Sequence, residues 1–120
     1  MEKWANIRGF EGHYQVSDKG RVRSLDRMIN TLRSYKFYKG RILRPGTCKG
    51  YLFVALKVGG VQKLYQVHTL VAKHFLGYSK RRPEVNHKDF NTRNNRLNNL
   101  EWVTSKENKR HARGRKALAL

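Results

Sequence analysis

One change in hydrophobic spacing, near residue 66, constrains the fold of this chain more than any other feature of the sequence. From residue 51 to 58 the apolar side chains alternate, which predicts a strand with one buried face. Gly59 and Gly60 can adopt the positive φ of a tight turn, so residues 61–67 are expected to return as the paired strand. The apolar spacing then becomes helical. This helical stripe is formed by Val67, Leu70, Val71 and Phe75, and Gly77 is its predicted end.

Shorter elements are predicted on both sides of this unit. Residues 14–25 are expected to form a small hairpin with its turn at Asp18 and Gly20, and residues 41–44 another extended piece. The segment from residue 26 to 36 is polar and mixed, and it predicts no element. The carboxy-terminal part is expected to contain a strand at 84–88, an asparagine-rich loop, a strand at 99–103 and a last helix.

The last helix has clear end signals. Thr104 followed by Glu107 fits a capping box, so the helix should begin near Ser105. Gly114 is expected to end it, which would leave a frayed tail. Strands followed by helices in this order predict an α+β protein.

The charge of the chain narrows its partners. It carries 27 Lys and Arg residues against 8 Asp and Glu residues, a formal net charge of +19. Such an excess favours a polyanion, because phosphate groups offset the self-repulsion of the chain. Membrane binding usually needs an amphipathic helix with a basic face, whereas these basic residues are spread along the chain among Tyr, Phe and Trp. We therefore expect a nucleic-acid partner and no membrane.

Two further absences restrict the class of protein. Cys48 is the single cysteine, which excludes an internal disulfide and a zinc site built on several cysteines. The amino terminus lacks the apolar run of a signal peptide, and no stretch approaches the ~20 apolar residues of a membrane helix. We expect a cytoplasmic protein.

Asparagine is concentrated in one short segment. Six of the fourteen positions from Asn86 to Asn99 are asparagine. Asparagine tolerates left-handed backbone and can bond its own backbone, so it suits an ordered polar loop. This explanation is sufficient for Asn91, Asn94 and Asn95. It accounts less well for the whole pattern, in which a histidine on the first strand is followed by a loop, a strand and a helix.

The whole pattern resembles the HNH endonucleases, in the branch found in phage and intron-encoded homing enzymes. The amino-terminal part is similar to a nuclease-associated modular motif, and the resemblance covers residues 4–111. The nuclease segments are VNHKDFN at 85–91, NNRLNNLEWVT at 94–104, EN at 107–108 and VHTLVA at 67–72. The amino-terminal segments are Trp4, GFEG at 9–12, Tyr14, VSD at 16–18 and GRVRSL at 20–25.

The resemblance implies a ββα-metal active site. His87 matches the general base of the family, and Asn86 stands where the family places a metal ligand. Asn99, twelve residues after His87, matches the asparagine that braces the base and the loop. Asn108, twenty-one residues after His87, matches the ligand contributed by the helix. The implied cofactor is one divalent ion, Mg²⁺ or Mn²⁺. Some members carry aspartate at the position of Asn86, which leaves the rate and the metal preference open.

The chemistry of phosphodiester hydrolysis agrees with these residue types. The reaction needs a deprotonated water, and a histidine titrates near neutral pH. A hard cation stabilises the phosphate and the departing 3′ oxygen. Asparagine carbonyls are hard ligands, and Mg²⁺ takes its other ligands from water and phosphate. Two neutral protein ligands form a thin shell, so we expect weak metal binding in the absence of DNA.

The other histidines receive lesser roles. His74 falls in the apolar stripe of the first helix, so it is expected to pack in the core. His68 is expected to cap or brace the nuclease core. His111 lies three residues after Asn108 on the same side of the helix and could approach the metal or a phosphate as an accessory residue. A DNA-facing or structural role for His111 is favoured.

Basic side chains near the predicted site are candidates for phosphate contacts. Arg21 and Arg23 alternate with a valine, so both can leave the core side of the first hairpin together. Arg93 and Arg96 lie in the loop and could clamp the phosphate that flanks the cut. The last helix adds Lys106, Lys109, Arg110 and Arg113.

These observations predict an α+β protein with a small antiparallel sheet lobe, a helix and a ββα-metal (HNH) finger. Residues 1–65 would form the lobe that docks on DNA, 66–113 the helix and nuclease motif, and 114–120 a basic, frayed tail. The expected activity is metal-dependent nicking of double-stranded DNA by a monomer, in a bacterial host cell if the gene belongs to a phage. Two alternatives stay open: a catalytically silent DNA-binding module with a nuclease fold, and an RNA-binding protein with Tyr and Phe as stacking platforms.

Overall fold

The change of spacing near residue 66 is a change from strand to helix. In the computed structural model, strand β7 (Tyr51–Val58) pairs antiparallel with β8 (Val61–Gln66), and helix α1 (Val67–Phe75) follows β8 directly. Gly59 and Gly60 have φ values of 62° and 78°, which the tight hairpin turn requires. The predicted hairpin and helix are therefore confirmed. The structure describes residues 1–30, 32–77 and 81–118.

The alternating face of β7 is buried as predicted. Val54 and Leu56 are 4% and 0% exposed, and they belong to the same core cluster as Leu70 and Val71 of α1. β7 is the central strand of a three-stranded antiparallel sheet, with β8 on one side and β6 (Gly46–Cys48) on the other. β6 was not predicted, because three residues are too short to show a hydrophobic period.

A second antiparallel sheet is built from the amino-terminal residues, in the order β1 (Trp4–Asn6), β2 (Tyr14–Ser17) and β3 (Val22–Ser24). The predicted hairpin at residues 14–25 corresponds to β2 and β3. The segment at 41–44 is extended as predicted, with a bridge between Ile42 and the β3 residue Arg23.

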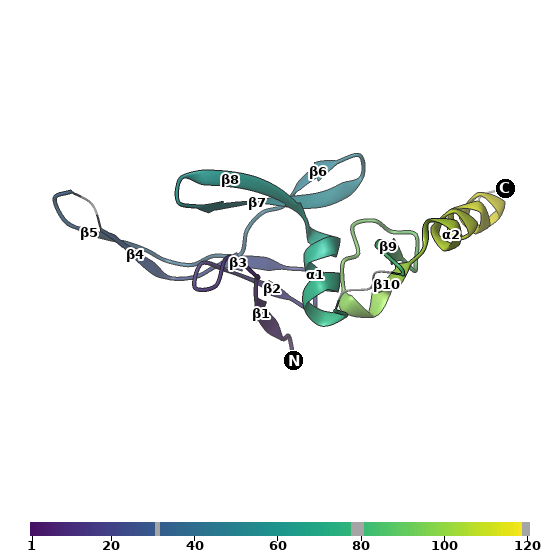
Figure 1. The fold of residues 1–120 in the computed structure, drawn as a ribbon, viewed down its shortest axis with the longest axis horizontal. Helices are drawn as coiled ribbons and strands as arrows, with labels where there is room; N and C mark the ends of the chain where they lie inside the picture. The colour runs from purple at the N-terminus through teal and green to yellow at the C-terminus, as the bar shows by residue number, and fades with distance from the viewer. Residues whose placement is uncertain (31, 78–80, 119–120) are drawn as a thin grey trace.

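The segment for which the sequence predicts no element is a β-hairpin arm. β4 (Arg27–Asn30) pairs antiparallel with β5 (Tyr35–Tyr38) in a separate two-stranded sheet. The arm extends from the body of the molecule (Figure 1). Its apolar side chains are solvent-exposed, with Met28 62% and Phe37 58% exposed. A ribbon without a buried face carries no hydrophobic alternation, so its sequence gives no strand signal.

The carboxy-terminal part forms the expected ββα finger. β9 (Glu84–His87) pairs antiparallel with β10 (Leu100–Val103), and a short 3₁₀ turn (Leu97–Asn99) precedes β10. Helix α2 (Ser105–Leu118) follows.

The start of α2 is the predicted capping box. The Glu107 N–H donates to Thr104 Oγ1 at 3.0 Å, and the Thr104 N–H donates to Glu107 Oε1 at 3.1 Å. The predicted end was wrong, because α2 continues through Gly114 to Leu118. One glycine costs a helix only about 1 kcal/mol relative to alanine, and the neighbouring Arg, Lys, Ala and Leu residues favour the helix. The last two residues of the predicted frayed tail, 119–120, lie outside the described residues.

One core joins the two predicted lobes. Buried residues of the amino-terminal sheet, of β7, of α1 and of β10 form a single cluster, so neither lobe has a separate core. The Leu97 N–H also donates to the Asp18 carbonyl at 2.8 Å, which links the turn after β2 to the finger. A Cβ added at Gly20 in that turn would lie 2.8 Å from the carbonyl oxygen of Asn95. The amino-terminal turn therefore packs closely on the asparagine loop.

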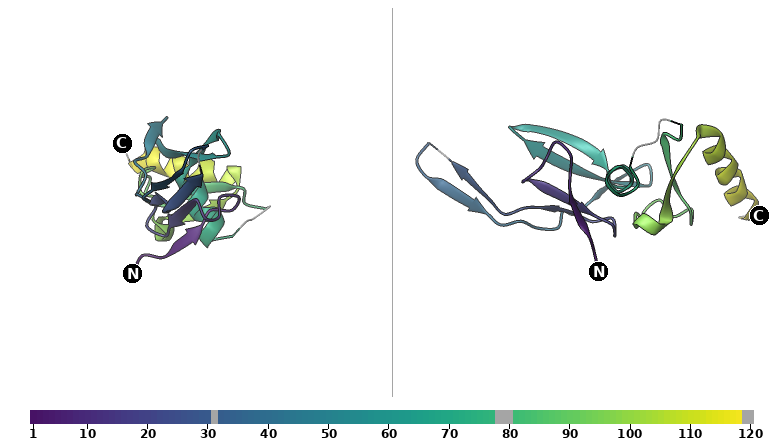
Figure 2. Two further views of the ribbon diagram at one scale, coloured as in Figure 1. Left: turned by 90° about the vertical axis from the view of Figure 1, so that its left-hand side faces the viewer. Right: turned by 60° about the horizontal axis from the view of Figure 1, so that its bottom comes forward.

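The molecule is long and narrow, 62 Å by 30 Å by 28 Å. The β4–β5 arm lies at one end and α2 at the other, with the sheets and α1 between them (Figures 1 and 2). Among the described residues no helix is long and apolar enough to span a membrane.

Candidate active site in the ββα finger

The loop between β9 and β10 is organised by Asn99. This side chain is 7% exposed and uses its carbonyl and both amide hydrogens. Oδ1 accepts from the Asp89 N–H at 3.0 Å, while Nδ2 donates to Asp89 Oδ1 at 2.9 Å and to the Asn94 carbonyl at 2.8 Å. These contacts are those of a residue that braces the loop. A direct part in catalysis for Asn99 stays a prediction.

His87 lies at the end of β9 with 5% of its surface exposed. Its Nε2 is 2.7 Å from Asn95 Oδ1. An amide oxygen only accepts, so Nε2 carries the hydrogen and Nδ1 keeps the lone pair. The side chain of Asn95 is 3% exposed. Asn95 therefore sets the tautomer of His87, a function that the sequence analysis did not assign to this loop residue.

A second histidine lies beside His87. His68, in the first turn of α1, is 6% exposed, and its ring centroid is 5.0 Å from that of His87 in an edge-to-face arrangement. The Tyr51 ring lies 5.2 Å from His68. Burial, with a smaller contribution from His87, lowers the pKa of His68 from 6.5 to about 4. His68 is therefore neutral at pH 7, and its packing agrees with the predicted bracing role.

Protonation of His68 is predicted to destabilise the fold. The unfolded chain binds a proton at this residue near pH 6.5, whereas the folded chain binds it only near pH 4. Stability from His68 is thus present above pH 6.5 and lost as the pH falls towards 4, by about 3 kcal/mol. Urea denaturation at pH 7.0, 5.5 and 4.0 measures this loss. His68→Phe should show a flatter pH dependence than the wild type and than a His13→Ala control, and equal slopes in all three would contradict the prediction.

One of the two predicted metal ligands, Asn86, lies on the other face of the β-hairpin from His87. Neighbouring side chains of a strand point to opposite faces, so His87 faces α1 while Asn86 faces away from it. Asn86 is 5% exposed, and its Nδ2 donates at 2.9 Å to Oε1 of Glu101, its cross-strand partner on β10. On α2, Asn108 Nδ2 donates to Glu84 Oε2 at 3.0 Å.

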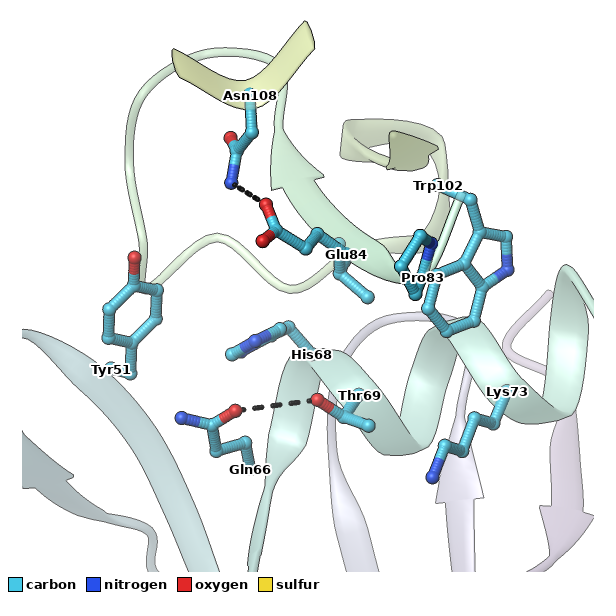
Figure 3. Close-up of a pocket in the computed structure, with 10 residues that line it drawn as sticks. Tyr51, Gln66, His68, Thr69, Lys73, Pro83, Glu84, Trp102 and Asn108 are labelled. Carbon is cyan, nitrogen blue, oxygen red and sulfur yellow. Dashed lines mark hydrogen bonds between the residues drawn. The ribbon is translucent and has the colours of Figure 1, made fainter. Parts of the chain in front are cut away.

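The two predicted ligands line different cavities. Asn108 lines a cavity of about 580 Å³ together with Tyr51, His68 and Glu84 (Figure 3). Asn86 lines a neighbouring cavity with Glu101 and His111. The structure thus brings Asn108 to the side of the two histidines, and it places Asn86 beside the accessory residue His111.

His111 is held by Phe90 rather than by a polar partner. The two rings are stacked, with centroids 4.1 Å apart and planes at 17°. Phe90, in the loop after β9, has a positive φ of 65°. His111 Nε2 is buried and has no hydrogen-bond partner among the described residues. A buried, unpaired ring nitrogen beside Asn86 is compatible with the accessory role predicted for His111.

The residue types, rather than a closed set of ligands, suit a hard divalent cation, since Asn86 and Asn108 line two neighbouring cavities. In Asn86 and Asn108 the amide nitrogen already donates to a carboxylate, so the carbonyl oxygen is the atom left for a metal ion. The hydrogen bonds from Ser105 and Asn108 also lower the pKa of Glu84, which keeps this carboxylate charged. No group of three or more His, Cys, Asp or Glu side chains that could hold a metal occurs in residues 1–30, 32–77 and 81–118.

The predicted DNA-contacting residues fall into two groups. Arg21 forms an ion pair with Glu2, and the Arg23 guanidinium lies 4.0 Å from the centre of the Trp4 ring and donates to Gln15. These two cations are already engaged within the amino-terminal sheet. The predicted cations of the loop and of α2 are all exposed: Arg93, Arg96, Lys106, Lys109, Arg110 and Arg113.

His74 is half-buried and connects the lobes. The Arg8 N–H donates to His74 Nε2 at 2.9 Å, and His74 Nδ1 is 2.8 Å from the Leu70 carbonyl. Because Nε2 accepts, Nδ1 carries the hydrogen and donates to that carbonyl. The prediction of a core position was wrong, because His74 is only half-buried and uses both ring nitrogens in hydrogen bonds instead.

The ββα finger, with a histidine on its first strand and an asparagine on its helix, is the arrangement of a class of nucleases. Comparison with known proteins gives the same class. Residues 65–110 match the HNH endonuclease family, and residues 2–57 match the NUMOD4 motif. The chain therefore carries an HNH endonuclease domain with a NUMOD4 motif ahead of it. HNH nucleases generally use a divalent metal ion.

Individual relatives come from phage and viruses. The chain is similar to DNA endonuclease I-HmuI of Bacillus phage SP01, with 42% identity over 106 residues, which is 88% of this chain and 55% of that protein. The chain is also similar to a solved structure described as DNA binding and cleavage by the HNH homing endonuclease I-HmuI, with a TM-score of 0.76 and 40% identity. The match covers 95% of this chain and 59% of the chain in that structure. The uncharacterized HNH endonuclease L245 of Acanthamoeba polyphaga mimivirus is 34% identical over 112 residues, 93% of this chain and 30% of that protein. The chain thus spans a little over half of I-HmuI. The α+β fold predicted from the sequence is confirmed.

Proposed function

We propose that this chain is a metal-dependent endonuclease that hydrolyses a phosphodiester of double-stranded DNA, with His87 as the general base. The observation that carries the proposal is the state of His87: it is buried in the ββα finger, and Asn95 holds its Nε2 hydrogen so that Nδ1 can accept a proton. The similarity to I-HmuI over nearly the whole chain supports the same reaction class.

The reaction is an in-line displacement at phosphorus. His87 Nδ1 takes a proton from a water molecule, and the water oxygen forms a bond to phosphorus while the bond from phosphorus to the 3′ oxygen breaks. The departing oxygen takes a proton from solvent. The products are a 5′-phosphate and a 3′-hydroxyl. Asn95, through its bond to Nε2–H, holds the ring for this transfer, and Asn99 holds the loop that carries Asn95.

Asn86 and Asn108 would hold one divalent ion, Mg²⁺ or Mn²⁺. When bound, such an ion neutralises the phosphate and stabilises the leaving oxygen. His111, whose Nε2 is unpaired in the structure, would be an accessory group next to Asn86.

Two exposed surfaces are proposed to contact DNA. On α2 the cations follow a helical stripe with spacings of i, i+3, i+4 and i+7: Lys106, Lys109, Arg110 and Arg113. At the other end of the molecule, the β4–β5 arm is a two-stranded ribbon, an element that a major groove can admit. Arg27 and Lys36 of the arm lie 5.8 Å and 5.2 Å from the Tyr38 ring. Residues 1–65 would dock on DNA chiefly through this arm, because Arg21 and Arg23 are already engaged.

Supercoiled plasmid tests the proposal. Incubation with Mg²⁺ or Mn²⁺ should convert it to open circles, and a chelator should prevent the conversion. One finger per chain predicts that open circles precede linear product, with the protein acting as a monomer. Intact plasmid that is nevertheless bound by the protein would instead favour a silent DNA-binding module. Stronger binding to single-stranded RNA than to duplex DNA at the same salt concentration would favour the RNA-binding alternative.

A further inference from the structure

The proposed metal site has a chemical problem. Its two ligands are neutral amides, and an amide oxygen binds a divalent cation less tightly than a carboxylate does. The surrounding chain is strongly basic, with a formal net charge of +19, which also opposes cation binding. A site of this kind needs another source of negative charge close to the ligands.

The structure provides a carboxylate beside each ligand. Glu101 is the cross-strand partner of Asn86 and accepts its Nδ2–H at 2.9 Å. Glu84 lies two residues before Asn86 on β9, in the cavity that also contains His68, and it accepts Nδ2–H of Asn108 at 3.0 Å. Glu84 is itself fixed by the Ser105 hydroxyl, which donates to its other oxygen at 2.7 Å. The two predicted ligands thus have the same local arrangement, although they lie on different elements.

This arrangement is unusual for the composition of the chain. Only 8 Asp and Glu residues occur in 120, and two of them contact the two predicted ligands. A third, Asp89, holds the bracing residue Asn99. Acidic side chains are therefore concentrated at the asparagines of the finger.

We infer that Glu84 and Glu101 are positioning residues of the metal site, an inference that rests on the function proposed above. Each carboxylate holds the NH₂ group of one ligand amide. An amide whose nitrogen is held cannot rotate by half a turn, so its carbonyl oxygen stays on the opposite edge, as Figure 3 shows for Asn108. The bond to a carboxylate also polarises the amide and increases the negative charge on its oxygen. The pair therefore acts chiefly by orienting the two amides, and its charge adds a smaller attraction for the cation.

Binding of Mn²⁺ to the whole protein tests this inference without any cleavage. Electron paramagnetic resonance of free Mn²⁺ gives the Kd for the wild type and for variants. Glu101→Leu and Glu84→Leu should each raise the Kd about 10- to 100-fold, as losses of an outer-shell partner do. Glu101→Gln keeps an acceptor for Asn86 and loses only the charge, so its Kd should rise about threefold. Glu11→Gln removes one charge from the amino-terminal lobe and should leave the Kd within about twofold of the wild type.

The outcomes separate the inference from the proposed function. No Mn²⁺ binding by the wild type at millimolar concentration, with or without duplex DNA, would overturn both. Wild-type binding with an unchanged Kd in both leucine variants would overturn the inference alone. A Kd in Glu101→Gln as weak as that of Glu101→Leu would show that the charge or direct ligation matters and the hydrogen bond does not, which also overturns positioning. Thermal denaturation and binding to DNA in a chelator identify any variant that fails to fold, and the glutamine variant then carries the test.

Discussion

Replacement of His87 by alanine is expected to reduce the rate of plasmid nicking about 100- to 10,000-fold, the range that a general base contributes. The ring of His87 is buried, and its Nε2–H is bonded to Asn95. Nδ1 is therefore the ring nitrogen that can accept a proton. Because His87 is not among the exposed cations, the affinity for duplex DNA should stay within about threefold of the wild type. The measurement is a time course of open-circle formation at saturating Mg²⁺, together with a binding titration in a chelator.

His13→Ala is the matched control for this variant. It removes another histidine, from the turn before β2, and should keep the rate of the wild type. Full activity in His87→Ala would contradict the assignment of the base. Loss of both nicking and DNA binding would indicate that the substitution unfolds the finger, and His87→Gln, which keeps a side-chain amide in the cavity, would then replace it.

The elements that the sequence predicts are those that bury one face. The alternation in β7 and the stripe in α1 arise because one side of each element enters the common core, so the period of the element appears in its sequence. The ββα finger was predicted for a different reason. Its capping box, its asparagine loop and the spacing from His87 to Asn108 together form a sequence pattern. That pattern is long enough to resemble a known family.

The β4–β5 arm was not predicted for the converse reason. Both of its faces are exposed, as Met28 and Phe37 show, so nothing in the segment alternates with burial. The end of α2 was misplaced because Gly114 was given the weight of a helix stop, although strong helix formers surround it.

The sequence names candidate residues for the site but not the contacts that they make. The resemblance to the HNH endonucleases assigns Asn86, Asn99 and Asn108, whereas the face that each one occupies depends on strand register. Register also explains why Glu84 and Glu101 went unnoticed. Their closeness to the two ligands follows only from the pairing of Glu101 with Asn86 and from the approach of α2 to β9. Strand alternation alone would have placed Glu84 on the face of Asn86, whereas the structure has it in the cavity with His68. Nothing in the sequence could have placed Asn108 against it.

The asparagine loop makes His87 depend on a residue that need not touch the substrate. Asn99 is buried, and its amide joins the Asp89 backbone and side chain to the Asn94 carbonyl. Asn95, which follows Asn94 in the chain, is the residue that is hydrogen-bonded to His87. Disturbing Asn99 should therefore affect both the stability of the finger and the orientation of the base.

Asn99→Ala is accordingly expected to lower the free energy of unfolding by about 2–4 kcal/mol, because it leaves partly buried backbone groups at Asp89 and Asn94 without their partner. The melting temperature should fall by roughly 10 °C, followed by circular dichroism at pH 7. Asn98→Ala, one residue earlier and exposed, should change the stability by less than about 0.5 kcal/mol. Below its melting temperature Asn99→Ala should also nick plasmid more slowly than Asn98→Ala. Equal melting temperatures for the two variants would show that the loop is held by its backbone alone, and would remove the physical link from Asn99 to His87.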